Sequence, residues 1–290
     1  MKKLLFLFLV TTLLLSCGEE GGLKGRLTLS ITDGPTDDIN VKGVNLVFLN
    51  VEMRRNGEWK SLKSFDQPIG VNLLEYTGGS SLLLIDQYVD PGEISAFRFT
   101  LNVANPNESV IRSPQSNITY ANGSSKPLYL ADTDNHQVVI EEQLGIETTG
   151  ITDITLDFDV RKSISLDGEN QFVMNPFVRV LETKSTGHIA ALVSNATGRV
   201  VAFAYKKGTF NGNESTPTDG ISYRNAISSC SVKGGKFGLG FLEPGEYDLF
   251  FVSLGETGQY QDILGSFRGV TVHSGEQKSL EIDLAALSPA

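Results

Sequence analysis

The chain has 290 residues, of which 24 are basic and 34 are acidic, giving a formal net charge of −10. An acidic surface repels phosphate backbones, and no basic patch with interleaved aromatic residues occurs, so nucleic acid is not an expected partner. Hydrophobic residues make up 40% of the chain. This composition is typical of globular domains rather than disorder, and the length suits two domains of ordinary size.

Residues 1–16 have the pattern of a lipoprotein signal peptide. Lys2 and Lys3 form a positive start, and the apolar segment from Leu4 to Leu15 is too short to span a bilayer, which needs roughly 20 residues. The following Leu14-Leu15-Ser16-Cys17 resembles the bacterial lipobox. That resemblance implies cleavage before Cys17, acyl chains on Cys17 and stable attachment to a membrane. The alternative is an ordinary secretory signal with an unrelated cysteine.

Residues 17–22 are expected to form the lipidated cysteine and a flexible tether, because Gly18-Glu19-Glu20-Gly21-Gly22 cannot pack. In some Gram-negative bacteria, an acidic run behind the lipidated cysteine resembles a tag for export to the cell surface. A plain solvated linker is the alternative. The sequence therefore predicts an outer-membrane lipoprotein and favours an outward-facing one.

Only one further cysteine follows Cys17. Cys230 has no partner for an internal disulfide, even in an oxidising compartment. It lies in Ile227-Ser-Ser-Cys-Ser-Val232, which favours a small buried residue over a reactive thiol.

Alternation of apolar and polar residues predicts strands throughout residues 23–182. Leu27, Leu29 and Ile31 share one face of the first strand, and Asn56-Gly57 predicts a hairpin that joins two long strands. Further strands are expected at residues 71–75, 80–85, 94–103, 137–143, 153–160 and 172–181. Short strands with frequent turns and no helical period predict an all-β sandwich.

A polar stretch at residues 182–187 marks a domain boundary, and alternation starts again over residues 187–290. The overall prediction is two antiparallel β-sandwich domains in tandem. Two segments rich in Gly, Asn, Ser and Pro, residues 104–126 and 208–222, are expected to be exposed loops that present a contact surface.

Several motifs in residues 25–181 resemble a bacterial lipoprotein family known only as a domain of unknown function. The most specific are Asp157-Phe-Asp-Val-Arg-Lys-Ser-Ile164 and Asn175-Pro-Phe-Val-Arg179, and Thr32-Asp-Gly-Pro-Thr-Asp-Asp-Ile39, Trp59, Asn72-Leu-Leu74 and Pro91-Gly92 also fit. The resemblance implies location and fold class but no reaction.

Residues 187–284 are similar to prealbumin-like sandwiches found as carboxypeptidase regulatory domains and starch-binding-like modules. The motif runs from Gly235 to Leu249 and contains Glu243-Pro-Gly-Glu-Tyr247; the opening Gly187-His-Ile-Ala-Ala-Leu-Val193 also fits. Such modules are usually spacers or docking units, and only some bind glycans.

Asp153, Asp157 and Asp159 fall on one face of the strand expected at residues 153–160. Neighbours at i and i+2 on a strand lie roughly 7 Å apart, which overlaps the ~6.5–9.5 Å separation of an inverting glycosidase pair. A solvated acidic face, balanced by Arg161 and Lys162, is favoured over a catalytic pair.

Asp33, Asp37 and Asp38 follow a strand end and suit oxygen ligation of calcium. Asp132, Asp134 and Asn135 form a second, weaker candidate, and neither group has EF-hand spacing. Asp33 before Gly34-Pro35 is more simply a turn residue. The three histidines are far apart in the sequence, so zinc is not expected.

The sequence favours a non-catalytic binding or scaffolding lipoprotein with a glycan or protein ligand and no required cofactor. The first alternative is a fimbrial or surface-assembly subunit that exchanges edge strands; a glycan hydrolase is more distant. Seven tyrosines could line a glycan surface, although core or edge packing is the more frequent role: Tyr76, Tyr88, Tyr120, Tyr129, Tyr205, Tyr223 and Tyr260.

Overall fold

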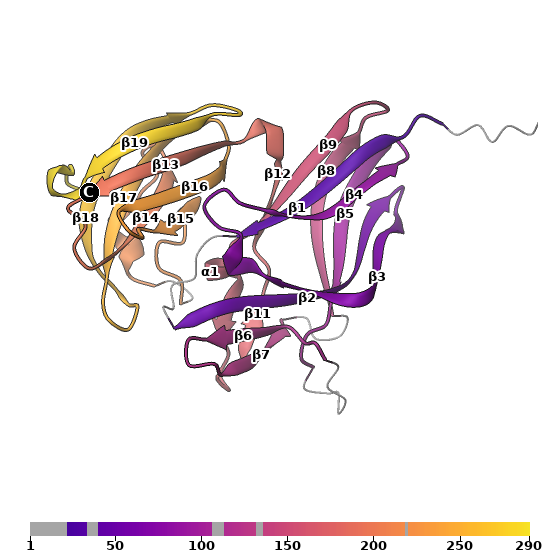
Figure 1. Cartoon of the computed structure of the whole chain (residues 1–290), viewed down its shortest axis with the longest axis horizontal. Helices are drawn as coiled ribbons and strands as arrows, with labels where there is room; N and C mark the ends of the chain where they lie inside the picture. Colours follow the sequence, from indigo (N-terminus) through magenta and orange to yellow (C-terminus); the bar gives the residue numbers. More distant parts are fainter. Residues whose placement is uncertain (1–21, 34–39, 106–112, 132–135, 218–219) are drawn as a thin grey trace, which may run out of the picture.

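The computed structural model describes residues 22–33, 40–105, 113–131, 136–217 and 220–290. The predicted all-β class is confirmed. Two lobes are visible in Figure 1: the sheets of one are built from strands up to Glu182, and those of the other from strands after Gly187. We call these the N-terminal sandwich and the C-terminal sandwich. Among the described residues, no helix has the length and apolar character needed to cross a membrane.

The N-terminal sandwich has a smaller and a larger sheet. The smaller sheet has the order β12 (Val178–Glu182), β9 (Ile151–Phe158), β1 (Gly25–Asp33), β4 (Leu82–Val89). The larger sheet has the order β10 (Ile164–Leu166), β11 (Phe172–Met174), β7 (Ser125–Leu130), β6 (Asn117–Tyr120), β2 (Val41–Arg55), β5 (Gly92–Leu101), β8 (Gln137–Ile146), with β3 (Glu58–Asn72) also paired to β2. Their shared core includes Leu29, Phe48, Phe97 and Phe158.

The predicted hairpin between β2 and β3 is confirmed. Asn56 and Gly57 have φ values of 51° and 80°, and Arg55 pairs with Glu58 on either side of them. Positive φ at both central residues matches the right-handed twist of the strands.

Three expected segments differ from the structure. The strand expected at residues 172–181 is divided into β11 and β12, which belong to different sheets; Pro176 lies in the break and cannot donate to a ladder. Residues 71–75 end as the 3₁₀ helix η1 (Leu73–Glu75), capped by the Asn72 side chain. Residues 104–126, expected as a loop, contain β6 and the start of β7. These short strands contain too few apolar residues for alternation to reveal them.

In its described residues, the C-terminal sandwich has seven strands. One sheet has the order β16 (Lys236–Leu242), β13 (Gly187–Ser194), β19 (Gln277–Asp283), and η4 (Leu284–Ala286) follows it. The other has the order β15 (Ser228–Ser231), β14 (Arg199–Lys206), β17 (Gly245–Leu254), β18 (Tyr260–Val272). Between them lies a core that includes Ile189, Leu239, Tyr247 and Phe251.

Residues 207–217 and 220–227 contribute side chains that cover the outer face of the four-stranded sheet. This segment has no strand in its described part and contains η3 (Gly212–Ser215). Phe210 stacks on Phe250 with ring centroids 3.6 Å apart, and Tyr223 stacks on Phe203 at 4.6 Å. Phe210, in the loop expected at residues 208–222 as a contact surface, and Tyr223, directly after that loop, therefore pack onto their own sandwich.

The first strand of each sandwich is central in its sheet and pairs in parallel with a strand late in the same sandwich. These pairs are β1 with β9 and β13 with β19. The β7–β11 pair is also parallel, and the other paired strands are antiparallel. A central first strand ties the start of each sandwich to its end.

Candidate functional site: a polar cluster between the two sandwiches

A single-turn helix, α1 (Val160–Ser163), begins directly after β9. Asp159 caps it, because its side chain accepts a hydrogen bond from the Lys162 backbone N–H at 3.1 Å. Asp33 Oδ1, at the end of the neighbouring strand β1, accepts from the Val160 N–H at 3.0 Å. Two carboxylates thus fix the position of α1.

Asp157 and Arg179 pair across β9 and β12. They are in register, and Arg179 donates from Nε at 3.0 Å and from Nη2 to Asp157 Oδ2. The Asp157 residue is only 9% exposed. Burial raises the pKa of its carboxyl, against the opposing effect of the Arg179 guanidinium.

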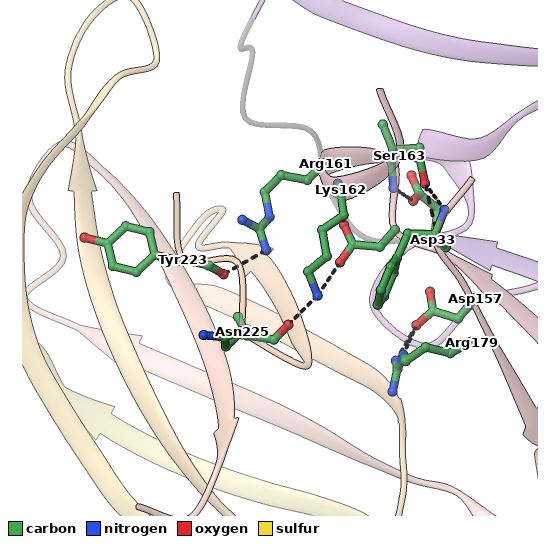
Figure 2. A network of polar contacts seen from close by, with 12 residues as sticks. Asp33, Asp157, Arg161, Lys162, Ser163, Arg179, Tyr223 and Asn225 are labelled. Atoms are coloured by element: carbon green, nitrogen blue, oxygen red, sulfur yellow. Dashed lines mark hydrogen bonds and ion pairs between the residues drawn. The ribbon is translucent and has the colours of Figure 1, made fainter. Parts of the chain in front are cut away.

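Arg161 and Lys162 extend from α1 to the C-terminal sandwich (Figure 2). The Arg161 guanidinium donates to the carbonyl oxygens of Ser222 and Tyr223, the latter at 3.2 Å. The Lys162 ammonium donates to the Ala226 carbonyl at 2.7 Å and lies 3.1 Å from Asp159 Oδ2. Burial lowers the pKa of Lys162, and Asp159 opposes that shift. The buried Arg161 and the half-buried Lys162 therefore connect the sandwiches.

The segment whose carbonyl groups accept these hydrogen bonds, residues 222–226, is held in place by contacts within the C-terminal sandwich. Glu214 accepts hydrogen bonds from the Tyr205 hydroxyl and from the Asn225 backbone and side-chain N–H groups, each at 3.0 Å. Tyr223 has a φ of 51°, unusual for a residue with a side chain. Its ring is held against Phe203 while its carbonyl accepts from Arg161. The carbonyl groups are thus already arranged for the cations.

A second contact brings two pairs of glycines together. Gly78 and Gly79 follow η1, and Gly238 and Gly240 lie on β16. A Cβ on Gly238 would lie 3.0 Å from the Gly78 carbonyl oxygen, and one on Gly240 would lie 2.5 Å from Gly79 N. The backbones can approach this closely only because none of these residues has a side chain.

The charges of the cluster balance, with Asp33, Asp157 and Arg161 buried and the other three half-buried. Three carboxylates (Asp33, Asp157 and Asp159) are matched by three cations (Arg161, Lys162 and Arg179). The hollow beside Asp33 and Asp157 has a volume of about 10 Å³, the smallest space that holds one water molecule. The cluster can hold the sandwiches together, and this hollow is too small for a substrate.

The expected solvated face of Asp153, Asp157 and Asp159 is corrected by the structure. Asp159 lies beyond the end of β9 and caps α1, and Asp157 is buried. Asp153 accepts a hydrogen bond from the Thr28 hydroxyl at 2.7 Å. Arg161 and Lys162, expected as balancing surface charges, instead bridge to the other sandwich, Arg161 buried and Lys162 half-buried. Alternation within one strand carries no sign of a neighbouring sandwich.

The first calcium candidate is only partly within the described residues. Asp33 is 5% exposed and accepts from Val160, whereas Asp37 and Asp38 lie outside the described part, as do Asp132, Asp134 and the lipidation candidate Cys17. Asn135 of the second candidate lies there too. The described residues contain no group of three or more metal-binding side chains. Calcium binding stays a prediction.

Sequence reasoning missed Arg179, Ser222 and Tyr223 as members of the cluster. For Arg179 the sequence offered one indication, its position at the end of the motif Asn175-Pro-Phe-Val-Arg179, which resembles the family of unknown function. Ser222 and Tyr223 contribute backbone carbonyls, and residue type gives no signal for such contacts.

A shallow groove lies on the outer face of the three-stranded sheet. It has a volume of about 560 Å³ and is lined by residues that include Ala190, Leu192, Lys236, Ser279 and Glu281. A second hollow of about 320 Å³ shares Leu192 and Glu281 with it. Leu192 is 52% exposed at the centre. An apolar floor with polar groups around it is typical of binding surfaces.

The seven tyrosines considered for a glycan surface differ in exposure. Tyr205 and Tyr223 are fully buried, whereas Tyr88 is 69% exposed.

The family model described as Domain of unknown function (DUF4382) matches residues 24–176. This range includes Asp33, Asp157, Asp159 and α1, and it ends before Arg179 and the C-terminal sandwich. No curated protein matches the chain.

Three solved structures illustrate the distant similarities. The chain is 11% identical to the Bacillus anthracis TIE protein, with 89% of this chain and 34% of that chain covered and a TM-score of 0.19. It is 12% identical to the minor pilin GBS52 of Streptococcus agalactiae, with coverage of 88% and 94% and a TM-score of 0.21. It is 10% identical to the fimbrial anchor protein Mfa2 of Porphyromonas gingivalis, with coverage of 82% and 81% and a TM-score of 0.21. Similarities at these TM-scores support no inference about function.

Proposed function

We propose, from the premise that the chain belongs to the DUF4382 family of domains of unknown function, that this protein is a non-catalytic binding and scaffolding lipoprotein. One observation carries the proposal: three of the candidate aspartates have structural roles in the cluster. Asp33 and Asp159 fix α1, and Asp157 pairs with Arg179. The hollow of about 10 Å³ beside them supports a structural role for the cluster.

Membrane attachment is the first part of the proposal. The acyl chains on Cys17 hold the protein in the outer membrane, residues 18–22 act as a tether, and the protein faces outward. The lipobox-like Leu14-Leu15-Ser16-Cys17 and the acidic Glu19-Glu20 pair support this placement.

A rigid body is the second part. Cations of α1 and close glycine contacts join the sandwiches, so that the anchored N-terminal sandwich positions the C-terminal one. The C-terminal sandwich is a prealbumin-like docking module. Its seven strands in sheets of three and four support this, as does Tyr247, whose hydroxyl donates to the Glu243 carbonyl at 2.7 Å across the Pro-Gly turn.

The ligand surface is the third part. The groove around Leu192 offers an apolar floor with Lys236, Ser279 and Glu281 beside it. This mixture suits a glycan or a polypeptide segment.

Metabolic labelling with a clickable palmitate analogue tests the anchor. The wild-type chain should carry the label and fractionate with the outer membrane, and Cys17→Ala should lose both properties. Cys230→Ser is the matched control and should remain labelled. Labelling that persists in Cys17→Ala would contradict the anchor.

A thermal-shift screen of the full chain in detergent, with a panel of polysaccharides, tests binding. A ligand that binds only the folded state at a hundred times its Kd adds about 2.7 kcal/mol to stability. The shift should disappear in Leu192→Asp and persist in Val139→Asp, which changes an exposed residue on β8. Adding calcium and then EDTA tests the Asp33 group in the same assay.

The competing proposals predict other results. Polymerisation by exchange of edge strands predicts ladders of oligomers on unreduced, mildly heated gels. Glycan hydrolysis predicts release of reducing sugars that is abolished by Asp159→Asn. Either result would contradict the scaffolding proposal.

A further inference from the structure

The two most exposed large apolar side chains of the described residues lie at one end of the N-terminal sandwich. Leu23 is 70% exposed and Tyr88 is 69% exposed. Tyr88 on β4 and Ile151 on β9 both pair with Arg26 of β1, so they lie on either side of it in one row across the smaller sheet. Ile151 is 49% exposed. Leu23 precedes β1 on the same side of this row.

This end of the sandwich is the one from which the chain runs back to Cys17. Figure 1 shows the chain entering β1 at the end of the N-terminal sandwich that lies away from the C-terminal sandwich. Residues 18–22 are all that separate Cys17 from Leu23. A chain spans at most roughly 3.6 Å per residue, which places Leu23 within about 22 Å of the lipidated residue. The other end of β1, at Asp33, is roughly 26 Å further along the strand.

The row combines apolar side chains with a neutral ion pair. Arg26 donates two hydrogen bonds of 2.7 Å to the Asp86 carboxylate. The Tyr88 side chain has an apolar ring and a polar hydroxyl, and such side chains are enriched where lipid headgroups meet acyl chains. Apolar side chains that surround a paired charge therefore suit the headgroup region of a bilayer.

We propose that this end of the N-terminal sandwich lies on the bilayer surface, with Leu23, Tyr88 and Ile151 inserted to the boundary between headgroups and acyl chains. The inference rests on the lipid anchor proposed above and adds the contact that sets the orientation of the protein. The C-terminal sandwich is then directed away from the membrane, because α1 and the junction adjoin the opposite end of β1 at Asp33.

The anchor explains how so small a contact can form. Three inserted side chains bind a bilayer weakly by themselves. A short flexible linker makes a second contact intramolecular, with an effective concentration in the millimolar range. The contact therefore needs only to favour one orientation of a protein that the acyl chains already hold at the membrane.

The charges around the row favour uncharged lipids. Exposed acidic side chains outnumber exposed basic ones in the nearby turns and strand ends, with Glu58, Asp90, Glu93 and Glu147 against Lys24 and Lys60. The Arg55 side chain donates to the Asp90 carbonyl at 2.7 Å, which holds the β4–β5 turn beside the end of β2. Anionic headgroups repel such a surface. Insertion should therefore be stronger in phosphatidylcholine than in membranes that contain phosphatidylglycerol, and salt should reduce the difference.

Lipid quenching of single fluorophores on the lipidated full chain tests the contact. Tyr88→Cys and Ile151→Cys are introduced separately into Cys230→Ser, coupled to the fluorophore NBD, and reconstituted in phosphatidylcholine vesicles that contain nitroxide-labelled lipid. Fluorescence should be lost at both positions. Leu83→Cys, on the same strand but roughly 17 Å further from the anchor, and Val139→Cys on β8 are the controls and should keep their fluorescence.

A second variant separates insertion from mere closeness to the anchor. Tyr88→Ser in the chain labelled at Ile151→Cys should restore fluorescence, and the matched Leu83→Ser should not. Circular dichroism establishes that these variants are folded.

Flotation with the vesicles reports the anchor separately. A chain that floats but is quenched at none of the four positions, or equally at all four, would overturn the contact and leave the anchor intact. Quenching that requires phosphatidylglycerol would also overturn it. A wild type that neither floats nor carries the palmitate label would overturn the anchor, and this inference with it.

Discussion

Arg161 is the residue on which the junction most depends. Its guanidinium is the hydrogen-bond donor for two backbone carbonyl groups of the other sandwich, and the residue is 7% exposed. A buried carbonyl that loses its donor costs about 1–3 kcal/mol. The neighbouring Lys162 donates to a third carbonyl, that of Ala226. Two side chains of α1 therefore supply the hydrogen-bond donors for three carbonyl groups of one segment of the C-terminal sandwich.

Arg161→Met retains an apolar side chain but removes every donor. The free energy of unfolding should fall by about 2–4 kcal/mol, because the Ser222 and Tyr223 carbonyls are left buried without this partner. Urea denaturation measures the change. Lys63→Met, on the exposed part of β3, is the control and should stay within about 0.5 kcal/mol of the wild type. Equal stability of the two variants would contradict the role assigned to Arg161.

His188 should make stability depend on pH. Its Nδ1 accepts a hydrogen bond from the Phe241 backbone N–H at 3.4 Å, which requires the neutral ring. Burial lowers its pKa below the ordinary value of 6.5. Below pH 6.5 the unfolded chain binds a proton that the folded chain excludes. The free energy of unfolding therefore decreases as the pH is lowered, until the pH is below the folded-state pKa of His188 as well. Above pH 6.5 His188 is neutral in both the folded and the unfolded state, and its contribution to stability does not change with pH.

Urea denaturation of the wild type and His188→Gln from about pH 7.5 to about pH 5 measures this effect. The difference in stability between the two proteins should shrink as the pH falls, since the carboxylates are the same in both. A difference that is flat across the range would show that His188 does not titrate with folding.

At the level of single residues, the sequence predicted the inward face of β9 correctly and its outward face wrongly. Ile154, Leu156 and Phe158 are buried as alternation requires, but Asp157 is buried too. Its cover comes from the other sandwich and from Arg179 on β12, both distant in the sequence. Local patterns report local solvation, and a second layer added by tertiary packing leaves no trace in them.

At the level of elements, turn chemistry was the most dependable signal. Asn56-Gly57 determines its hairpin by local backbone preference alone. The end of β9 also had a local cause, since Asp159 followed by a cationic pair caps a helix rather than continuing a strand. β6 and β7 could not be predicted in this way, because pairing with neighbouring strands stabilises them more than their own composition does.

The close contact of β16 with the turn after η1 gives an element-level prediction. Gly240→Ala should lower stability by about 1–3 kcal/mol, because the new methyl group would overlap the Gly79 backbone. Gly70→Ala, on β3, is the matched control, since nothing lies within 4 Å of a Cβ there. It should be neutral to within about 0.5 kcal/mol. Denaturant midpoints compare the two, and similar losses would contradict a packed glycine contact.

At the level of the whole molecule, we expect the contacts between the two sandwiches to make them one body. The family model covers residues 24–176, yet the cations of α1 within that range bind backbone beyond it. Contacts between domains are often weak enough to allow relative motion. Here cations of α1 are matched by carbonyl groups of the C-terminal sandwich, and glycines of the two sandwiches lie in close contact, which favours a fixed arrangement suited to presenting a binding surface.

Scanning calorimetry of the full chain in detergent tests this central claim most directly. The wild type should unfold in a single transition with equal calorimetric and van't Hoff enthalpies, as one cooperative unit does. The double variant Arg161→Met, Gly240→Ala should unfold in two transitions, one for each sandwich. Two separate transitions already present in the wild type, and unchanged in the double variant, would contradict a rigid junction.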